Sequence, residues 1–187
     1  YTEILNFLPG SNNVIVYEDN KEKCKSIFKK ANVIFTLDFN SLGRARNLSS
    51  LITSSSAKII MIDHHENPDN YADITISNSK MSSTCEMVYD FICSIDKSKI
   101  DNKIATCIYT GIVADTGSFR FPSTTSKTLN VGSELINYGV DVTEIFEKLH
   151  NNFKFKRLKL PTFNKAIDDR FKKKYWYSLN DKPDVII

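Results

Sequence analysis

Apolar runs and amphipathic stripes alternate along the first half of the chain. Residues 59–62 are apolar without a break, which is typical of a strand buried on both faces of a parallel sheet. Residues 33–38 form a similar run that ends in a carboxylate, and residues 13–17 predict a further short strand. Apolar positions recur at helical spacing within residues 18–31, and a helix is also expected over residues 42–52. This β-α-β-α-β order predicts a parallel sheet.

The second half of the chain is dominated by helical patterns. After an edge strand at residues 74–77, Ser82 or Ser83 is expected to cap a helix with Glu86 in its first turn. Three further helices are predicted at residues 100–113, 125–138 and 142–150. The fold class that follows is α/β, a Rossmann-like parallel sheet flanked by helices.

Composition narrows the class of protein. The 187 residues are 41% apolar and 25% charged, as in an ordinary globular domain. No apolar run is long enough to span a bilayer, so no membrane partner is expected. The four cysteines form no CxxC pair, and Cys24, Cys85 and Cys107 fall on apolar helix faces. We interpret them as reduced core residues, which favours a cytoplasmic protein.

Charge is divided unevenly along the chain. Residues 151–187 carry ten Lys and Arg against four Asp and Glu, whereas residues 1–150 carry fifteen against eighteen. A basic segment of this kind can attract a polyanion, but a solvated helix and linker is the interpretation that we favour.

The candidate chemistry gathers where predicted strands end. Asp38 follows one strand, and Asp63, His64 and His65 follow the next. Because parallel strands point the same way, these side chains are expected at one edge of the sheet, where ligands of α/β proteins bind. A carboxylate after a strand often serves only as a cap or loop anchor, but the adjacent imidazoles favour a metal site. Carboxylate and imidazole suit Mn²⁺, Fe²⁺ or Zn²⁺, and the lack of thiolate argues against a structural zinc.

Three motifs occur together along the chain. Asp63-His64-His65 closes one strand, Asp38 closes the previous one, and residues 115–117 (DTG) follow further on. The set resembles the DHH phosphoesterase family. Residues 82–86 (SSTCE) and 109–125 are similar to the branch that includes the bifunctional oligoribonucleases/pAp phosphatases, also called nanoRNases. The resemblance covers nearly the whole chain.

The resemblance implies a role for each site residue. Asp38 and Asp115 match carboxylates that bridge two Mn²⁺ ions, and His64 matches a ligand of one ion. His65 matches the histidine that faces the substrate phosphate, while Asp63 is expected to orient His64. Adjacent strand residues point to opposite faces, so one imidazole can bind metal while the other faces substrate.

Phosphate contact is expected from a second group of residues. Ser83, Thr84 and Arg120 are the candidates, because hydroxyls and guanidinium suit phosphate oxygens. Arg120 lies among phenylalanines, so stacking or a structural pairing is an equal alternative for this side chain.

Two features of the family have no match in the sequence. The first motif, a His-x-x-x-Asp-x-Asp, is expected upstream of Tyr1, and the remaining histidine, His150, is expected at the surface. The glycine-rich His motif of the C-terminal domain is also unmatched. The expected organisation, truncated at both ends, is a catalytic domain that lacks its first strand and motif (1–150), a linker helix (151–174) and the start of a C-terminal substrate-binding domain (175–187).

The function that the resemblance implies is hydrolysis of phosphate esters by a metal-activated water. Short oligoribonucleotides and pAp are the expected substrates, with cyclic dinucleotide phosphodiesterase and exopolyphosphatase as alternatives within the family. A non-catalytic nucleotide- or metal-binding module is the rival from another class. Little activity is expected of these 187 residues alone, and a homodimer is one arrangement that the sequence leaves open.

Overall fold

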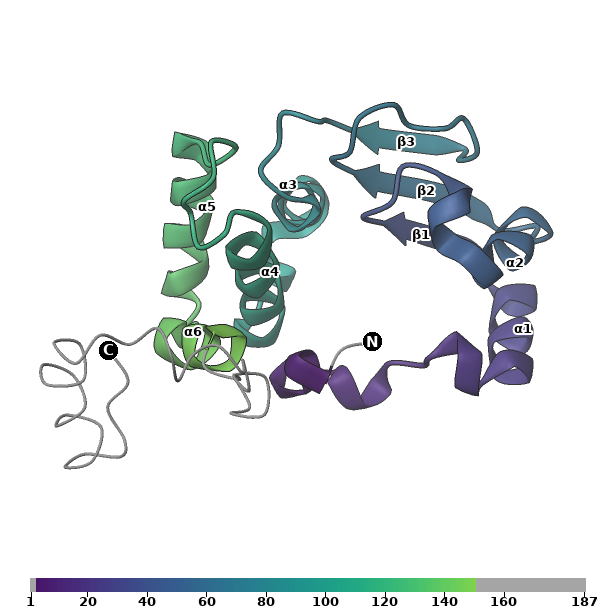
Figure 1. The fold of residues 1–187 in the computed structure, drawn as a ribbon, viewed down its shortest axis with the longest axis horizontal. Helices are drawn as coiled ribbons and strands as arrows, with labels where there is room; N and C mark the ends of the chain where they lie inside the picture. The colour runs from purple at the N-terminus through teal and green to yellow at the C-terminus, as the bar shows by residue number, and fades with distance from the viewer. Residues whose placement is uncertain (1–2, 151–187) are drawn as a thin grey trace, which may run out of the picture. The chain divides into compact units, whose positions relative to one another are not determined.

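The sheet consists of three parallel strands that end together. The computed structural model describes residues 3–150, in which β1 (Val33–Leu37), β2 (Lys58–Asp63) and β3 (Ile74–Ser77) lie in the order β1-β2-β3 (Figure 1). Leu37 pairs with Ile62, and Asp63 pairs with Ser77, so all three carboxyl ends meet at one edge. This parallel sheet flanked by helices confirms the predicted α/β class, including its edge strand.

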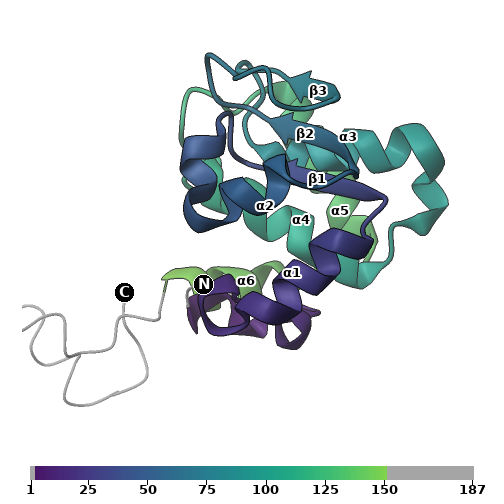
Figure 2. The ribbon, with the colours of Figure 1, turned by 90° about the vertical axis from the view of Figure 1, so that its right-hand side faces the viewer.

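The helices of the described residues differ in length and in place. The α-helices are α1 (Lys21–Lys30), α2 (Ser49–Thr53), α3 (Thr84–Asp96), α4 (Asn102–Asp115), α5 (Ser126–Asn137) and α6 (Val142–His150). The 3-10 helices are η1 (Glu3–Phe7), η2 (Ser11–Asn13), η3 (Tyr17–Asp19), η4 (Leu42–Leu48) and η5 (Lys97–Lys99). The strand arrows point toward the part of the fold that holds α3, while α1 lies toward their starting ends (Figures 1 and 2).

Side-chain caps set where the long helices begin. The Ser83 hydroxyl accepts a hydrogen bond from the Glu86 backbone N–H, so Ser83 rather than Ser82 caps α3. The Asp101 carboxylate caps α4 in the same way. Thr125 begins α5 with a reciprocal capping box. These caps satisfy backbone donors that a helix leaves without partners at its first turn.

The apolar core lies among the helices α3 to α6. Ile112, Val113, Leu135 and Ile145 have at most 1% of their surface exposed. Contacts connect α4 to both α3 and α5, and α3 in turn contacts β2. The central strand is therefore covered, whereas alternate residues of β1 are not. Of the three cysteines predicted to lie in the core, Cys24 is buried, whereas Cys85 and Cys107 are half-buried.

Three local predictions are wrong. Residues 13–17 form no strand, because Val14 is 51% exposed and the segment runs from η2 into η3 without a partner in the sheet. The helix expected over residues 42–52 is instead the 3-10 helix η4 followed by the short helix α2, and η4 is kinked at Arg46, whose φ of 49° is not helical. The strand at residues 33–37 is not fully buried, because β2 is its only neighbour in the described sheet.

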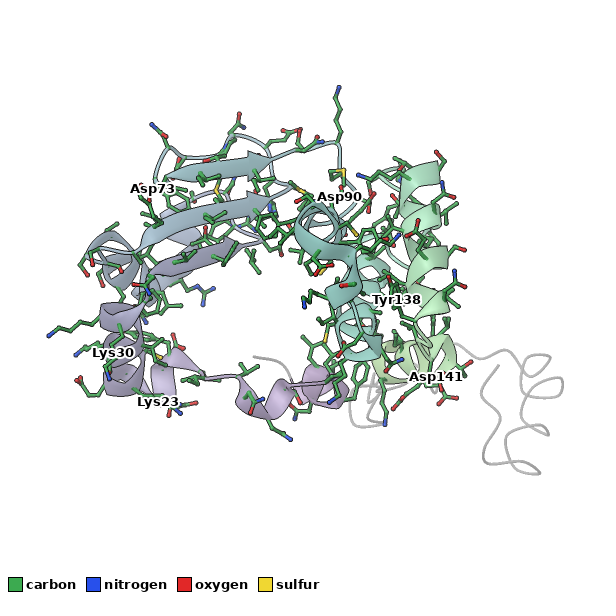
Figure 3. The ribbon with its side chains drawn as sticks, turned by 180° about the vertical axis from the view of Figure 1, so that it is seen from behind. Lys23, Lys30, Asp73, Asp90, Tyr138 and Asp141 are labelled. Carbon is green, nitrogen blue, oxygen red and sulfur yellow. The ribbon has the colours of Figure 1, made fainter. Side chains whose placement is uncertain are left out.

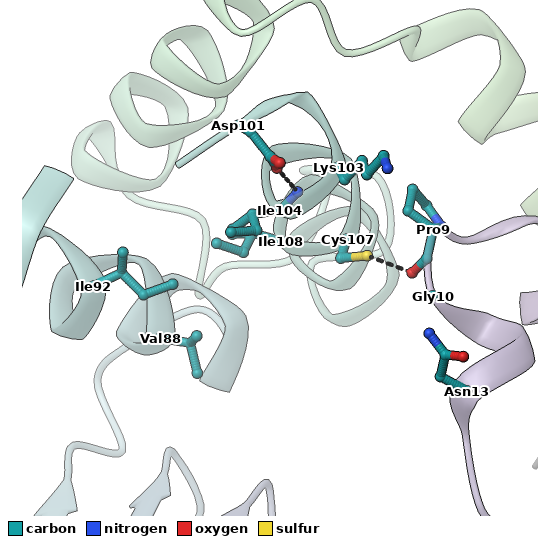
Figure 4. Close-up of a pocket in the computed structure, with 10 residues that line it drawn as sticks. All are labelled: Pro9, Gly10, Asn13, Val88, Ile92, Asp101, Lys103, Ile104, Cys107 and Ile108. Carbon is teal, nitrogen blue, oxygen red and sulfur yellow. Dashed lines mark hydrogen bonds between the residues drawn. The ribbon is translucent and has the colours of Figure 1, made fainter. Parts of the chain in front are cut away.

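Two further features of the described residues lie apart from the candidate site. None of the described helices is both long and apolar enough to cross a membrane. A pocket of about 550 Å³ lies beside α3 and α4, where Cys107 Sγ is 3.6 Å from the Pro9 carbonyl oxygen (Figure 4). Its lining includes none of the candidate site residues. The predicted linker helix and the strand at residues 175–179 lie outside the described residues.

The close approach of α3 and α4 at Gly111 is testable. A Cβ at this position would lie 2.1 Å from Cys85 Sγ, so Gly111→Ala should lower the free energy of unfolding by about 1–3 kcal/mol. Chemical denaturation measures the change. Gly43→Ala is the control, because the nearest atom to its Cβ would be 3.8 Å away. Adding Cys85→Ala should recover part of the loss. A Gly111→Ala protein as stable as the wild type would contradict the close contact.

Candidate metal centre

Asp38 stands at the end of β1, directly beside β2. Its backbone N–H donates to the Ile62 carbonyl at 3.1 Å, which continues the strand ladder by one residue. Its φ of 66° is left-handed, a conformation that Asp tolerates better than most residues do. The Thr84 hydroxyl at the start of α3 donates to Asp38 Oδ1 at 2.8 Å. The carboxylate is thus turned toward α3 and held there, with 54% of the side chain exposed.

Both histidines lie beside Asp38. His64 Nε2 is 3.7 Å from Asp38 Oδ1, and His65 Nδ1 is 4.0 Å from the same oxygen. The imidazole rings are edge-on to each other, with centroids 4.9 Å apart. β2 ends at Asp63, so the strand alternation that would separate the two rings no longer applies. One donor atom from each of these three residues lies within 4.8 Å of the others.

Asp63 is buried and orients His65. Its Oδ1 accepts a hydrogen bond from His65 Nδ1 at 2.7 Å, and its Oδ2 accepts one from the His65 backbone N–H at 2.8 Å. The prediction that Asp63 orients His64 is therefore wrong. The reason is local, because an Asp side chain readily accepts a hydrogen bond from the backbone N–H two residues later in the chain. His64 Nδ1 instead lies 3.3 Å from the Met81 carbonyl oxygen.

The two imidazole rings have similar hydrogen-bond partners at Nδ1. In each ring Nδ1 lies near an oxygen acceptor, which favours the tautomer with the proton on Nδ1 and leaves Nε2 available as a ligand atom. This pattern is common for metal-bound histidine. One carboxylate and two imidazoles without a thiolate fit Mn²⁺, Fe²⁺ or Zn²⁺. Among the described residues, the cluster is therefore a possible metal site.

Asp115 is the last residue of α4 and lies just outside that cluster. Burial raises the pKa of its carboxyl group above the ordinary value, and the nearby Asp38 raises the pKa further. His64 and His65 partly offset this shift. The charges of the cluster therefore act on the Asp115 carboxyl group. The group of donor atoms within 4.8 Å of one another nevertheless contains only Asp38, His64 and His65.

A tight left-handed turn follows Asp115. Gly117, Ser118 and Phe119 have φ angles of 55°, 65° and 63°. Thr116 is fully buried and closes this turn, since its hydroxyl donates to the Ile112 carbonyl and accepts from the Phe119 N–H. Consecutive left-handed residues are strained, and such strain is concentrated at functional sites. The turn fixes where the chain leaves the end of α4.

The predicted phosphate contacts have structural partners. Ser83 is fully buried and caps α3, while Thr84 bonds Asp38, so both hydroxyls act within the protein. Arg120 is exposed, and its Nε donates to the Gly117 carbonyl at 2.7 Å. The roles of these residues toward a substrate stay predictions. The structural pairing of Arg120 matches one of the two alternatives for that side chain.

The sequence interpretation missed the part played by Asn40, which it considered only as a helix cap. The Asn40 side-chain amide donates to the Glu66 carbonyl at 2.6 Å. The Asn40 backbone carbonyl accepts from the Asp69 N–H at 2.8 Å. These bonds tie the segment after β1 to the loop after β2. The available signal was its position two residues beyond Asp38, in the loop region where α/β sites form.

The fold and the donor cluster define a class of protein, an α/β domain with a carboxylate–histidine cluster that could hold a metal at the carboxyl edge of a parallel sheet. Residues 2–112 match the DHH family, N-terminal domain, which is more than half of the chain. The chain belongs to the DHH family.

Individual relatives agree with this assignment. The chain is 43% identical over 98 residues to the bifunctional oligoribonuclease and PAP phosphatase NrnA of Bacillus subtilis (strain 168), covering 51% of the chain and 31% of that protein. It is 36% identical over 91 residues to the NrnA of Thermus thermophilus, covering 49% and 28%. An exopolyphosphatase-related protein from Bacteroides fragilis aligns with a TM-score of 0.82 and 37% identity, covering 84% of the chain and 46% of that structure. The chain's matches span about a third of these curated relatives, and together they support a phosphoesterase.

The raised pKa of Asp115 has a consequence for stability. Because folding raises this pKa, the ionised carboxylate destabilises the metal-free fold at pH 7, and its place at a helix C-terminus adds to the cost. Asp115→Asn should therefore stabilise the metal-free protein by about 0.3–1 kcal/mol in thermal unfolding. The gain should disappear below about pH 4, as the carboxyl group becomes protonated in both states.

The matched control is Asp101→Asn, at the other end of the same helix. Asn caps a helix as well as Asp does, and the lost charge at this end was favourable, so no gain in stability is expected. Equal unfolding temperatures for wild type and Asp115→Asn at pH 7 would contradict the unfavourable environment of Asp115.

Proposed function

We propose that this protein is a metal-dependent phosphoesterase that cleaves short oligoribonucleotides to mononucleotides and dephosphorylates pAp. The observation that carries the proposal is the cluster of Asp38, His64 and His65 at the carboxyl edge of the sheet, in a chain of the DHH family. Similarity to proteins named for both activities supports the choice of substrates.

The metal sites would be built from residues at three element ends. Asp38, His64 and Asp115 are the residues that would hold Mn²⁺ in this proposal. Bound divalent ions supply a water of lowered pKa and neutralise charge on the phosphate. A His-x-x-x-Asp-x-Asp motif would complete the site, and the 187 residues do not contain it.

In this proposal His65 contacts the phosphate, and Asp63 positions His65. Asp63 fixes the orientation of the His65 ring through its bond to Nδ1. Nε2 can then contact a phosphate oxygen with little loss of conformational entropy. Thr84 positions Asp38 through its hydrogen bond. Arg120, which is exposed beside the turn that follows Asp115, would contact a phosphate from that side, and Ser83 acts by fixing the start of α3.

Other substrates define the competing functions. The aligned Bacteroides fragilis structure is named exopolyphosphatase-related, which favours polyphosphate as the second candidate. Cyclic dinucleotides and a purely binding role are the remaining alternatives. A panel of short RNA, pAp, cyclic dinucleotide and polyphosphate separates them by product release, since only the proposed function yields mononucleotides from RNA. A cytoplasmic location and a homodimer stay predictions.

The function is tested on the protein expressed from its complete reading frame. His64→Ala and Asp115→Asn should each lower Mn²⁺-dependent mononucleotide release from a short RNA by about a hundredfold or more, because each removes a proposed ligand. Circular dichroism checks that both variants remain folded. Asp101→Asn, which removes a carboxylate far from the site, should leave turnover unchanged. Full turnover in either ligand variant would refute the site.

The bond from Thr84 to Asp38 gives a second test. Thr84→Val keeps the shape of the side chain but removes the hydroxyl, so Mn²⁺ affinity should fall about tenfold as Asp38 loses its orientation. Thr84→Ser keeps the donor and should retain the affinity. Calorimetric titration with Mn²⁺ measures both variants. Equal affinities for the Val and Ser variants would show that the hydroxyl has no part in the metal site.

A further inference from the structure

Two loops enclose a polar pocket next to His65. The first loop follows β2 and the second follows β3, so the pocket lies at the same carboxyl edge as the donor cluster. Its volume is about 400 Å³. The lining includes His65, Glu66, Asn67, Asn78, Ser79 and Lys80. With Ser77 also in the lining, two amides, two hydroxyls, a carboxylate and an ammonium group border a space that begins at one of the candidate site residues.

Backbone hydrogen bonds fix both walls of the pocket. The first loop is held by Asn40, which bonds the Glu66 carbonyl and the Asp69 N–H. The second loop is held at Asn78, whose N–H donates to the Asp63 carbonyl at 3.2 Å. The Asn78 side-chain oxygen also accepts from the Lys80 N–H at 3.0 Å. Both walls are therefore tied to the strand ends that position the histidines, which lowers the entropic cost of binding.

The hydrogen-bond donors of the pocket, together with Lys80, suit an anion. In the described part of the chain, Lys80 has no carboxylate within ion-pair distance, whereas Lys58, Lys97 and Lys127 are all paired. Glu66 brings a negative charge to the lining, but it is exposed and is held there through its backbone carbonyl. Lys80 Nζ and the amide groups of the two asparagines are donors suited to phosphate oxygens.

We propose that this pocket binds the second phosphate of a substrate that carries two, while the first lies at the donor cluster. His65 borders both the pocket and the donor cluster. One substrate molecule could therefore place its reacting phosphate at the cluster and its second phosphate in the pocket. Lys80 supplies the charge, and Asn67 and Asn78 supply neutral donors. This inference rests on the proposed function, and it names the feature by which pAp and RNA would be preferred over a mononucleotide.

The test compares binding of pAp and AMP, which differ by one phosphate, to the protein expressed from its complete reading frame. Calorimetric titration in EDTA at low salt prevents turnover and removes the contribution of metal. Wild type should prefer pAp, and Lys80→Ala should weaken pAp binding about tenfold with AMP binding unchanged. Lys80→Arg should keep most of the preference. Lys30→Ala is the control, because this lysine ends α1 and is not part of the pocket lining (Figure 3).

Each outcome separates this inference from the proposed function. Equal wild-type affinities for pAp and AMP, or the same loss for both ligands in Lys80→Ala, would overturn the inference. So would a loss in Lys30→Ala as large as that in Lys80→Ala, because it would indicate a general charge effect. A preference for pAp that depends on Lys80, in a protein that releases no mononucleotide with Mn²⁺, would keep the pocket and refute the proposed function.

Discussion

The parallel pairing of β1 with β2 is the constraint on which the candidate site depends. Because Leu37 lies opposite Ile62, Asp38 emerges beside Asp63 and the two histidines that follow it. A shift of one residue in this register would turn the side chains of β1 to the opposite face and move Asp38 away from the histidines. The hydrogen bond from Asp38 N–H to the Ile62 carbonyl extends the pairing to the site itself. The geometry of the donors is thus a property of the sheet rather than of a flexible loop.

Several features of the site work against stability. Asp38 and the turn after Asp115 adopt left-handed backbone conformations, and Asp115 carries its charge at a helix C-terminus near another carboxylate. Such features persist when the surrounding structure over-determines them. A cation bound among the carboxylates would remove much of their repulsion and would stabilise the folded state. The unfavourable electrostatics of the metal-free site are therefore consistent with a site built for a cation.

The start of α3 joins the site to the helical core. Ser83 caps the helix, and Thr84, the next residue, bonds Asp38. Glu86 is buried one turn further on, where its carboxylate accepts hydrogen bonds from the hydroxyls of Ser82 and Thr128. One short segment thus connects β1, α3 and α5. The SSTCE stretch that marks the family resemblance is the same segment that makes these connections.

The sequence by itself determined the order of strands and helices, the edge at which Asp38 and the histidines meet, and the family. The elements and the edge follow from local apolar periodicity and from parallel strand direction, whereas the family follows from the resemblance of motifs such as Asp63-His64-His65; all of these can be read along the chain. Only the tertiary structure decided that Asp63 bonds His65, that Thr84 holds Asp38 and that residues 13–17 do not join the sheet. The physical reason is that a hydrogen-bond partner or a strand neighbour lies across space, where sequence periodicity carries no information.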